Sequence, residues 1–203
     1  MARAGLSEEA VVVEAERIAD DAGLPRLTLA ALADSLGVRQ PSLYKHIDGM
    51  KGLQRSIAVR AKTELADTLG RAAVGRARGD AIRAVARTYR QWALEHPGRY
   101  AATVRAPMPG DVEDEAASAA AVKVVLDVLS GYHLDGDAAI DATRTLRSAL
   151  HGFVSLETSG GFGLPVNIDH SFKRLVDALI TVFEIEATRT TYGGDGHDHH
   201  DHP

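Results

Sequence analysis

Residues 28–51 contain two short helical stretches separated by a single glycine, and few folds accommodate this combination. Apolar residues in the first stretch recur at the spacing of one helix face: Leu29, Leu32, Ala33 and Leu36. Gly37 follows where a helix ends in the left-handed conformation, which glycine adopts without a steric penalty. Pro41 then begins a second helix, because its missing N–H costs nothing in a first turn. The pattern therefore predicts a helix–turn–helix corner.

The second stretch has one apolar side and one side of hydrogen-bonding groups. The apolar side consists of Val38, Leu43 and Ile47. The remaining polar positions are Arg39, Gln40, Ser42, Tyr44, Lys45 and His46. A short helix of this kind suits the major groove of DNA in both shape and chemistry. Such corners also occur in proteins that never bind DNA, so a purely structural, solvated corner is the alternative.

The charge distribution favours DNA binding over a solvated corner. The whole chain has a formal net charge of −5, and residues 76–203 alone carry 13 basic against 18 acidic residues. Residues 38–62 instead have six basic residues against Asp48, a local balance of +5. The six are Arg39, Lys45, Lys51, Arg55, Arg60 and Lys62. A localised basic patch on an acidic protein is the electrostatic pattern that attracts phosphates.

The corner resembles the TetR family of bacterial transcriptional regulators. The matching positions are Thr28, Leu32, Ala33, Leu36, Gly37, Val38, Leu43, Tyr44, His46 and Lys51. The resemblance covers residues 7–70 and departs from the family at Ile47, where an aromatic residue is usual. That change is conservative and should leave the corner packed. The resemblance implies an all-helical, homodimeric regulator with an N-terminal three-helix DNA-binding domain.

The resemblance also implies which residues contact DNA. Phosphates would be contacted by Thr28, Tyr44, His46 and Lys51. Base edges or the adjacent backbone would be contacted by Arg39, Gln40, Pro41, Ser42 and Lys45. Physical chemistry agrees, because Thr28 caps a helix N-terminus, where free N–H groups favour an anion. Gln40 suits adenine and Arg39 suits guanine, and the sequence leaves open which of them reads bases.

The apolar alternation typical of strands is missing, so we expect an all-α fold. Helices are expected over residues 7–22, 28–36, 40–46, 49–72, 79–96, 98–105, 111–131, 136–159 and 168–187. Residues 1–50 would form the helix–turn–helix domain, linked through helix 49–72 to a larger helical ligand-binding and dimerisation domain over residues 76–188. The His-, Asp- and Gly-rich residues 189–203 cannot build a core, and we expect a disordered tail there. Weak metal binding by its histidines is the alternative.

Composition excludes several classes of protein. The chain has no cysteine, which rules out a disulfide framework and thiolate sites. No apolar run approaches the roughly 18 residues of a membrane-spanning helix, and a signal peptide is not evident, so we expect a cytoplasmic protein without a membrane partner. Catalytic motifs and nucleotide fingerprints are also missing, so we expect no catalytic residue, metal or cofactor. A helical-bundle enzyme and a protein-interaction module without DNA binding are the alternatives.

The helix predicted over residues 136–159 has one apolar stripe, and the last predicted helix is apolar on more than one side, which indicates a second copy of the chain as a neighbour. We expect the dimer interface to contain Leu150, Phe153, Val154, Phe172, Leu175, Leu179, Val182 and Phe183. The alternative is that the domain itself covers both sides. Two-fold symmetry would set the reading helices about 34–36 Å apart on a pseudo-palindromic operator. His151 and Gly152 also resemble the WHG-type ligand-binding domain of the family, although Arg147 stands where that type has tryptophan.

A small-molecule effector would bind inside the helical body, in a mostly apolar site with a few polar groups. The predicted pocket residues are Tyr89, Trp92, His96, Tyr100, His151 and Phe153. Aromatic residues at helical spacing are also common in cores, so a purely structural role is the alternative. We therefore expect a homodimeric repressor that its effector releases from double-stranded operator DNA. Activation would use the same parts.

Overall fold

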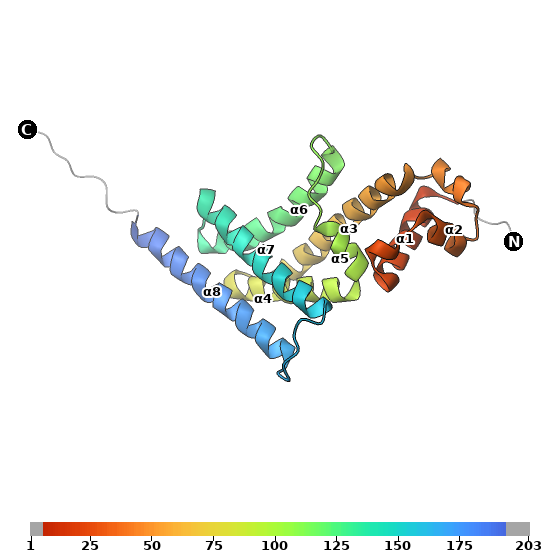
Figure 1. Ribbon diagram of the computed structural model, residues 1–203. Helices are drawn as coiled ribbons and strands as arrows, with labels where there is room; N and C mark the ends of the chain where they lie inside the picture. The colour runs from red at the N-terminus through yellow and green to blue at the C-terminus, as the bar shows by residue number, and fades with distance from the viewer. Residues whose placement is uncertain (1–5, 194–203) are drawn as a thin grey trace, which may run out of the picture. The chain divides into compact units, whose positions relative to one another are not determined.

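The computed structural model describes residues 6–193, with side chains for residues 6–189, and this part of the chain is helical without a strand. Figure 1 shows the elements in chain order. The helices are α1 (Glu8–Ala22), α2 (Leu29–Leu36), α3 (Gly49–Ala73), α4 (Arg78–Glu95), α5 (Pro97–Thr103), α6 (Val112–Leu129), α7 (Gly136–Thr158) and α8 (Ile168–Gly193). Three short 3₁₀ helices are η1 (Leu24–Arg26), η2 (Gln40–Lys45) and η3 (Ser130–Tyr132). The all-α prediction is confirmed.

Helix boundaries follow local sequence signals. Ser7 accepts a hydrogen bond from the backbone N–H of Ala10 at 3.1 Å and so caps α1. Most predicted segments agree with the observed helices to within two residues. Two segments differ: the second corner helix is a 3₁₀ helix, and α8 continues to Gly193, six residues beyond the prediction. Residues 189–193 of the predicted tail are therefore helical, and its remaining residues lie outside the described part of the chain.

The described chain divides into two compact units, and the division differs from the predicted domain boundary. Unit 1 contains the residues up to Thr68 together with Gln91–Ala121. Unit 2 contains Leu69–Arg90 and the residues from Val122 onward. The helix–turn–helix segment therefore shares its compact unit with α5 and the first half of α6, which were expected in the ligand-binding domain. The searched helices of the described chain are too short or too polar to cross a membrane.

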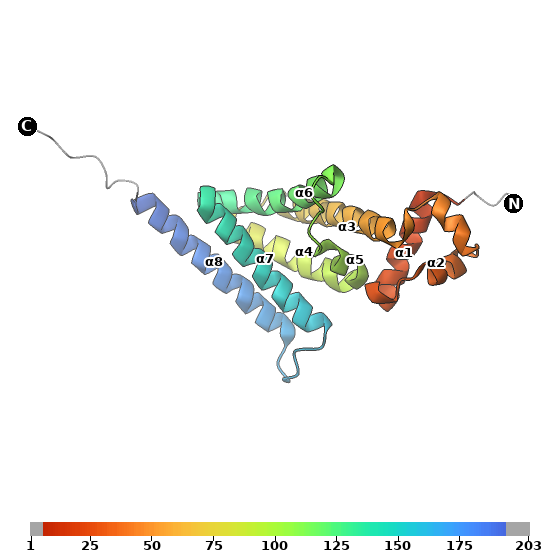
Figure 2. The same cartoon turned by 45° about the horizontal axis from the view of Figure 1, so that its top comes forward.

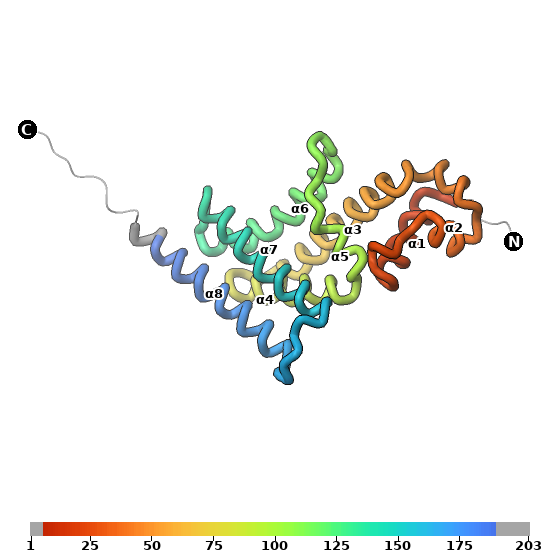
Figure 3. Tube along the Cα trace, in the orientation of Figure 1, coloured from red at the N-terminus to blue at the C-terminus, as the bar shows by residue number. Residues whose placement is uncertain are grey.

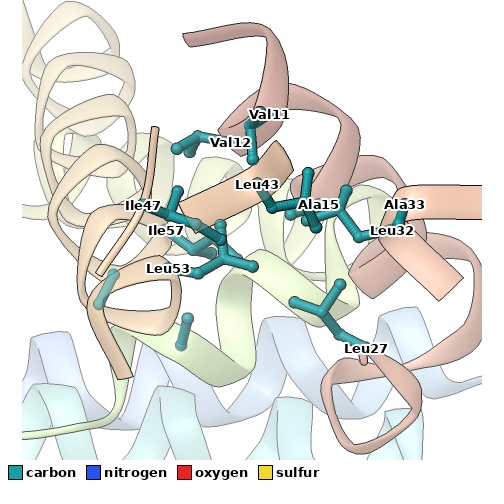
Figure 4. Packing of buried hydrophobic residues seen from close by; sticks show 12 residues of the cluster. Val11, Val12, Ala15, Leu27, Leu32, Ala33, Leu43, Ile47, Leu53 and Ile57 are labelled. Atoms are coloured by element: carbon teal, nitrogen blue, oxygen red, sulfur yellow. The ribbon is translucent and has the colours of Figure 1, made fainter. Parts of the chain in front are cut away.

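Unit 1 has a core built around the corner. Its buried members come from α1, α2, η2, α3 and α5, and Figure 4 shows most of them converging on Leu43: Val11, Val12, Ala15, Leu27, Leu32, Ala33, Leu43, Ile47, Leu53, Ile57, Ala58 and Ala102. Leu32, Leu43, Leu53 and Ile57 are each 0% exposed. Burying side chains of this size stabilises a fold by about 1.5–3 kcal/mol each. The core therefore fixes the corner to the helices around it.

Gly98 allows α5 to pack directly on the backbone of α1. A Cβ atom at this position would lie 2.1 Å from the carbonyl carbon and oxygen of Ala19 and 2.6 Å from the backbone nitrogen of Asp20. These distances are far inside van der Waals contact, and backbone atoms cannot move aside as a flexible side chain does. Only glycine is therefore compatible with this approach of the two helices.

Unit 2 is organised around the last two helices. Figures 1 and 2 show α7 and α8 side by side, and Figure 3 follows the chain through the loop 159–167 that joins them. Tyr132 of η3 and Phe183 of α8 pack edge to face with ring centroids 6.0 Å apart, and both are buried. The guanidinium of Arg90 lies 5.0 Å from the ring of Phe172 and 5.8 Å from that of Phe153. Aromatic packing thus connects α4, α7 and α8 within this unit.

We expect Gly98→Ala to destabilise the protein by about 1–3 kcal/mol, because the added methyl group forces α5 away from α1. Gly70→Ala is the matched control, since a Cβ atom there meets only Val124 at an ordinary 3.8 Å. Gly70 lies inside α3, so alanine should stabilise the helix by up to about 1 kcal/mol. Urea denaturation measures both changes. Equal stability of Gly98→Ala and the wild type would contradict the close approach of α5 and α1.

Candidate nucleic-acid interface

The corner has the geometry that the sequence predicts. The hydroxyl of Thr28 accepts a hydrogen bond from the backbone N–H of Ala31 at 3.1 Å, which caps α2. Gly37 ends α2 in the left-handed conformation, with φ 65° and ψ 32°. The N–H groups of Gly37 and Val38 donate to the carbonyls of Asp34 and Ala33 at 3.1 and 3.0 Å. The last carbonyls of α2 are thus satisfied, and the chain turns sharply into η2.

The 3₁₀ helix η2, which we call the reading segment, buries its apolar side and exposes its polar side. Leu43 is 0% exposed and Ile47 is 8% exposed, so isoleucine leaves the corner packed, as expected. Tyr44, between them, is 57% exposed. The exposed predicted contacts are Thr28, Arg39, Gln40, Pro41, Tyr44, Lys45 and Lys51, whereas Ser42 and His46 are half-buried. The predicted presentation of hydrogen-bonding groups away from the core is therefore observed.

The segment is a 3₁₀ helix, although an ordinary helix was expected over residues 40–46. Its N–H groups donate three residues back, from Ser42 to Arg39 and from His46 to Leu43, both at 2.8 Å. Ile47 returns to the wider spacing and donates to Leu43 at 3.0 Å. Short helical pieces often adopt this tighter winding.

The basic patch is smaller than the sequence suggested. Arg55, Arg60 and Lys62 form ion pairs with carboxylates elsewhere in unit 1. The structure gives Arg39, Lys45 and Lys51 no ion pair among the described residues. The local balance of +5 therefore overstates the charge that is free to meet DNA, because opposite charges from distant segments neutralise half of the basic residues.

Two of these ion pairs connect α3 to the beginning of α6. Arg55 donates to both carboxylate oxygens of Asp111 at 2.6 Å and to Glu113 at 2.9 Å. Lys62 pairs with Asp114 at 2.5 Å, with side chains only 5% and 0% exposed. Arg105 also reaches Asp114 at 3.1 Å, so the buried carboxylate has two cationic partners. The hydrogen bonds from Arg55 lower the pKa of Asp111 from its usual 3.8 to about 2.

These acidic partners were missed in the sequence. The run of acids at residues 111–115 is visible there, but Arg55 and Asp111 are 56 positions apart. Pattern along one helix cannot pair residues at such a separation. The only signal in the sequence that could have suggested the pairing is the presence of a basic helix and a separate acidic run.

The predicted pocket residues divide between the two units. Trp92, His96 and Tyr100 belong to unit 1, where Trp92 and Tyr100 are buried. The rings of Trp92 and His96 meet edge to face at 5.2 Å. Tyr89, His151 and Phe153 belong to unit 2 and are half-buried. Of the six predicted residues, the structure brings Trp92 and His96 into ring contact.

Phe153 lies in an aromatic cluster within unit 2. Its ring centroid lies 4.8 Å from Phe162 and 5.0 Å from Phe172. A cavity of about 400 Å³ in the same unit is lined by the end of α3, the start of α4 and the end of α6, and none of the six predicted pocket residues lines it.

The predicted dimer surface includes residues that the single chain already buries. Five of its eight residues are buried within the single chain and so serve its own core: Leu150, Val154, Phe172, Leu179 and Phe183. Phe153 and Leu175 are half-buried, and only Val182 is exposed, at 43%. Helix α8 nevertheless has a second apolar side, as expected, with Ile185 48% exposed beside Val182. Periodicity identified the two apolar sides of α8, and the predicted interface drew residues from both, namely Phe172, Leu175, Leu179 and Phe183 from one side and Val182 from the other.

Comparisons with known proteins agree with this geometry. Residues 82–179 match the Tetracyclin repressor-like C-terminal domain. An uncharacterized HTH-type transcriptional regulator of Mycobacterium tuberculosis is 42% identical over 192 residues, which cover 94% of this chain and 86% of that protein. The chain belongs to the TetR family of transcriptional regulators. YobS, an uncharacterized HTH-type transcriptional regulator of Bacillus subtilis, is 37% identical over 162 residues, which cover 79% of this TetR-family chain and 83% of YobS.

Solved structures show the same TetR-family fold. Apo ActR from Streptomyces coelicolor has a TM-score of 0.71 at 17% identity, covering 93% of this chain and 100% of ActR. TetR from Acinetobacter baumannii AYE has a TM-score of 0.63 at 19% identity, covering 90% of this chain and 99% of that TetR chain. The protein is thus a DNA-binding transcriptional regulator of the TetR family, and it is not an enzyme.

The Arg55–Asp111 pair should stabilise the TetR-family fold above the usual carboxylate pKa and lose this contribution in acid. Because folding lowers the pKa of Asp111 to about 2, its contribution is complete above pH about 5 and falls between pH about 4 and about 2. We expect the free energy of unfolding of Asp111→Asn to lie below that of the wild type at neutral pH. The gap should narrow as the pH drops through this range.

Urea denaturation from pH 7 to pH 3 measures this gap. The amide oxygen introduced by Asp111→Asn can still accept the N–H of Asp114, so the capping hydrogen bond at 3.2 Å is retained in the variant. Repeating the substitution in an Arg55→Gln background gives the control, because the partner that lowers the pKa is then missing. A gap that is independent of pH in the wild-type background would show that Arg55 does not bind the ionised carboxylate.

Proposed function

We propose that the protein is a homodimeric cytoplasmic repressor that binds a pseudo-palindromic operator through η2 and is released by a small-molecule effector. The observation that supports DNA binding is the exposed polar face of η2 above a buried Leu43. The segment is anchored by its apolar side and presents guanidinium, amide, hydroxyl and ammonium groups outward. These groups form hydrogen bonds with base edges and phosphates in a major groove.

Phosphate contacts come from the ends of the corner. Thr28 lies at the N-terminus of α2, and Lys51 lies in the first turn of α3. Tyr44 and His46 frame the end of η2, so these four residues would position the protein on the backbone without reading sequence. Arg39, Gln40, Pro41, Ser42 and Lys45 would contact base edges or the adjacent backbone.

Dimerisation would use the outer faces of α7 and α8. On α8 an exposed stripe at helical spacing contains Ala178, Val182, Ile185 and Arg189. On α7 an exposed or half-exposed stripe of small residues contains Thr145, Ser148, Gly152 and Ser155. A Cβ atom at Gly152 would meet nothing of its own chain within 4 Å, which leaves room for a neighbouring helix. These two stripes are the unpartnered faces that a symmetric four-helix contact needs.

A small-molecule effector is supported by two structures with a similar fold. ActR was solved in complex with (S)-DNPA, and a variant of the Acinetobacter TetR was solved with minocycline. In the present protein we propose an effector site of the same mostly apolar kind; of the six residues predicted for it, Trp92, His96 and Tyr100 lie in unit 1, whereas Tyr89, His151 and Phe153 lie in unit 2. An effector that prefers a conformer unsuited to the operator reduces DNA affinity by its own difference in affinity between the two conformers.

Lys51, which has no ion pair among the described residues, and Arg55, which has two, allow a controlled test of DNA binding. Each phosphate contact contributes about −0.9 to the slope of log K against log salt concentration, so Lys51→Gln should make the slope of a dimer shallower by about 1.8. Arg55→Gln is the matched control one helical turn away. Because Arg55 already binds Asp111 and Glu113, its removal should leave the slope nearly unchanged.

Fluorescence anisotropy with a duplex selected from a random pool measures both slopes between about 50 and 200 mM salt. A wild-type protein without affinity for any duplex would refute the DNA-binding proposal and favour a protein-interaction module. Equal slopes for Lys51→Gln and the wild type would refute only the phosphate contact of Lys51.

A charge on the exposed stripe of α8 should separate the two copies. Ile185→Asp places a carboxylate in the proposed apolar contact, and its desolvation there should shift the protein to monomers. Glu184→Gln is the neighbouring control, on an exposed position outside the stripe. Sedimentation velocity distinguishes monomer from dimer, and a dimeric Ile185→Asp would exclude this stripe from the interface.

A further inference from the structure

Arg99 occupies the place where α1, α3 and the junction of α4 and α5 meet. Its Nε donates to Oδ2 of Asp20 at 2.7 Å, and its backbone N–H donates to Oδ1 of the same residue at 2.8 Å. Its Nη1 donates to Glu64 at 2.7 Å, and its Nη2 lies 2.6 Å from Nδ1 of His96. The Arg99 and Asp20 side chains are only 18% and 14% exposed. One guanidinium therefore connects three helical elements at once.

We propose that Arg99 is a positioning residue that fixes α1 in one orientation and thereby sets the operator spacing that the regulator accepts. The inference rests on the proposed function, because it concerns how two reading segments are held for one duplex. Arg99 itself is assigned no contact with DNA.

Steric and polar contacts act together at this joint. The absence of a Cβ atom at Gly98 lets α5 lie against the backbone of α1, and the next residue locks that approach with two hydrogen bonds to Asp20. An apolar contact alone would allow sliding, since dispersion attraction has little directional preference. The planar fork of a guanidinium bound to carboxylates on two helices allows far less rotation or translation. Gly98 therefore allows α5 to approach α1 closely, and the hydrogen bonds of Arg99 fix the orientation of the two helices relative to each other.

The orientation of α1 passes directly to the reading segment. Val11 and Ala15 of α1 belong to the same buried cluster as Leu43 of η2. Arg17 donates to the hydroxyl of Ser35 in α2 at 3.2 Å, and Ser35 in turn donates to Glu14. Rotation of α1 would therefore carry α2 and η2 with it, because close-packed interiors transmit displacement.

The joint also receives the end of α4. The indole nitrogen of Trp92 lies 3.4 Å from Glu64, whose other carboxylate oxygen binds Arg99. His96, which follows α4, contacts both the ring of Trp92 and the guanidinium. Arg99 thus holds α1 in register with the last turn of α4 as well as with α3.

Arg90 provides a matched control for the loss of such an arginine. Its side chain is 15% exposed, it binds Glu157 through two hydrogen bonds, and it lies in unit 2, whereas α1 belongs to unit 1. Arg90→Gln and Arg99→Gln should therefore lose comparable stability. Only Arg99→Gln should change how α1 is held.

The test uses the palindromic duplex that the full-length wild-type protein selects from a random pool. Affinity is measured for this duplex, for versions with one base pair added or removed at the centre, and for a duplex with a single half-site. The wild type and Arg90→Gln should reject altered spacing. For Arg99→Gln we expect this discrimination to fall about tenfold, with half-site affinity unchanged, because α1 no longer has one fixed orientation.

Asp20→Asn provides a second variant if Arg99→Gln does not fold. It keeps the cation and its contact with Glu64 but weakens the link to α1, so discrimination should fall in the same direction by a smaller factor. Unchanged spacing discrimination in a folded Arg99→Gln or Asp20→Asn protein would overturn the proposal and leave Arg99 a stabilising residue. A wild type that selects no duplex, or that tolerates every spacing, would instead overturn the proposed function on which the inference rests.

Discussion

The burial of Leu43 is the interaction on which the reading surface depends. Leu43 is fully enclosed by side chains from α1, α2 and α3, and it sits in the middle of a segment that is too short to be stable alone. Fixing this one side chain fixes the rotation of η2 about its axis. The polar residues on both sides of Leu43 must then point away from the core. The hydrogen-bonding groups that we propose to contact DNA are thus exposed because Leu43 is buried.

Other helices of unit 1 pack against η2 and keep it in place. Helix α1 contributes to the core under η2, and α5 approaches α1 so closely that Gly98 cannot carry a side chain. The compact unit around the reading segment therefore includes elements that follow it by more than forty positions along the chain. A DNA-binding domain drawn at residue 50 would cut through this packing. Helices α1 and α5 and most of α3 therefore belong to the same packed unit as η2.

Local patterns predicted most of the fold, and contacts between distant segments explain what they could not. Ser7, Thr28, Gly37 and Pro41 mark helix ends through their own backbone and side-chain chemistry, so they are readable without coordinates. The outward face of η2 was predictable for the same reason, because the spacing of the apolar residues along this segment shows which positions face the core and which face away from it. The two apolar sides of α8 were also visible. Which side faces the core depends on neighbours from α7 and η3, so periodicity alone could not show that the chain itself buries the stripe containing Phe183.

Charge illustrates the limit most clearly. Lys51, Arg55 and Lys62 are four and seven positions apart, so they lie along one face of α3 and look equivalent in the sequence. At the start of α6, Asp111 and Glu113 pair with Arg55, and Asp114 pairs with Lys62. Among the described residues Lys51 has no ion pair.

Carboxylates at the start of α6 would also limit where a phosphate backbone can lie in the proposed complex. Glu113 and Glu115 are exposed at the start of α6, and like charges near a phosphate are unfavourable. Under the proposed mode of binding, DNA would therefore be favoured near η2 and the first turn of α3 and disfavoured beyond Arg55. The acidic run that neutralises two cations in the folded chain would thus define one edge of the proposed DNA-binding surface.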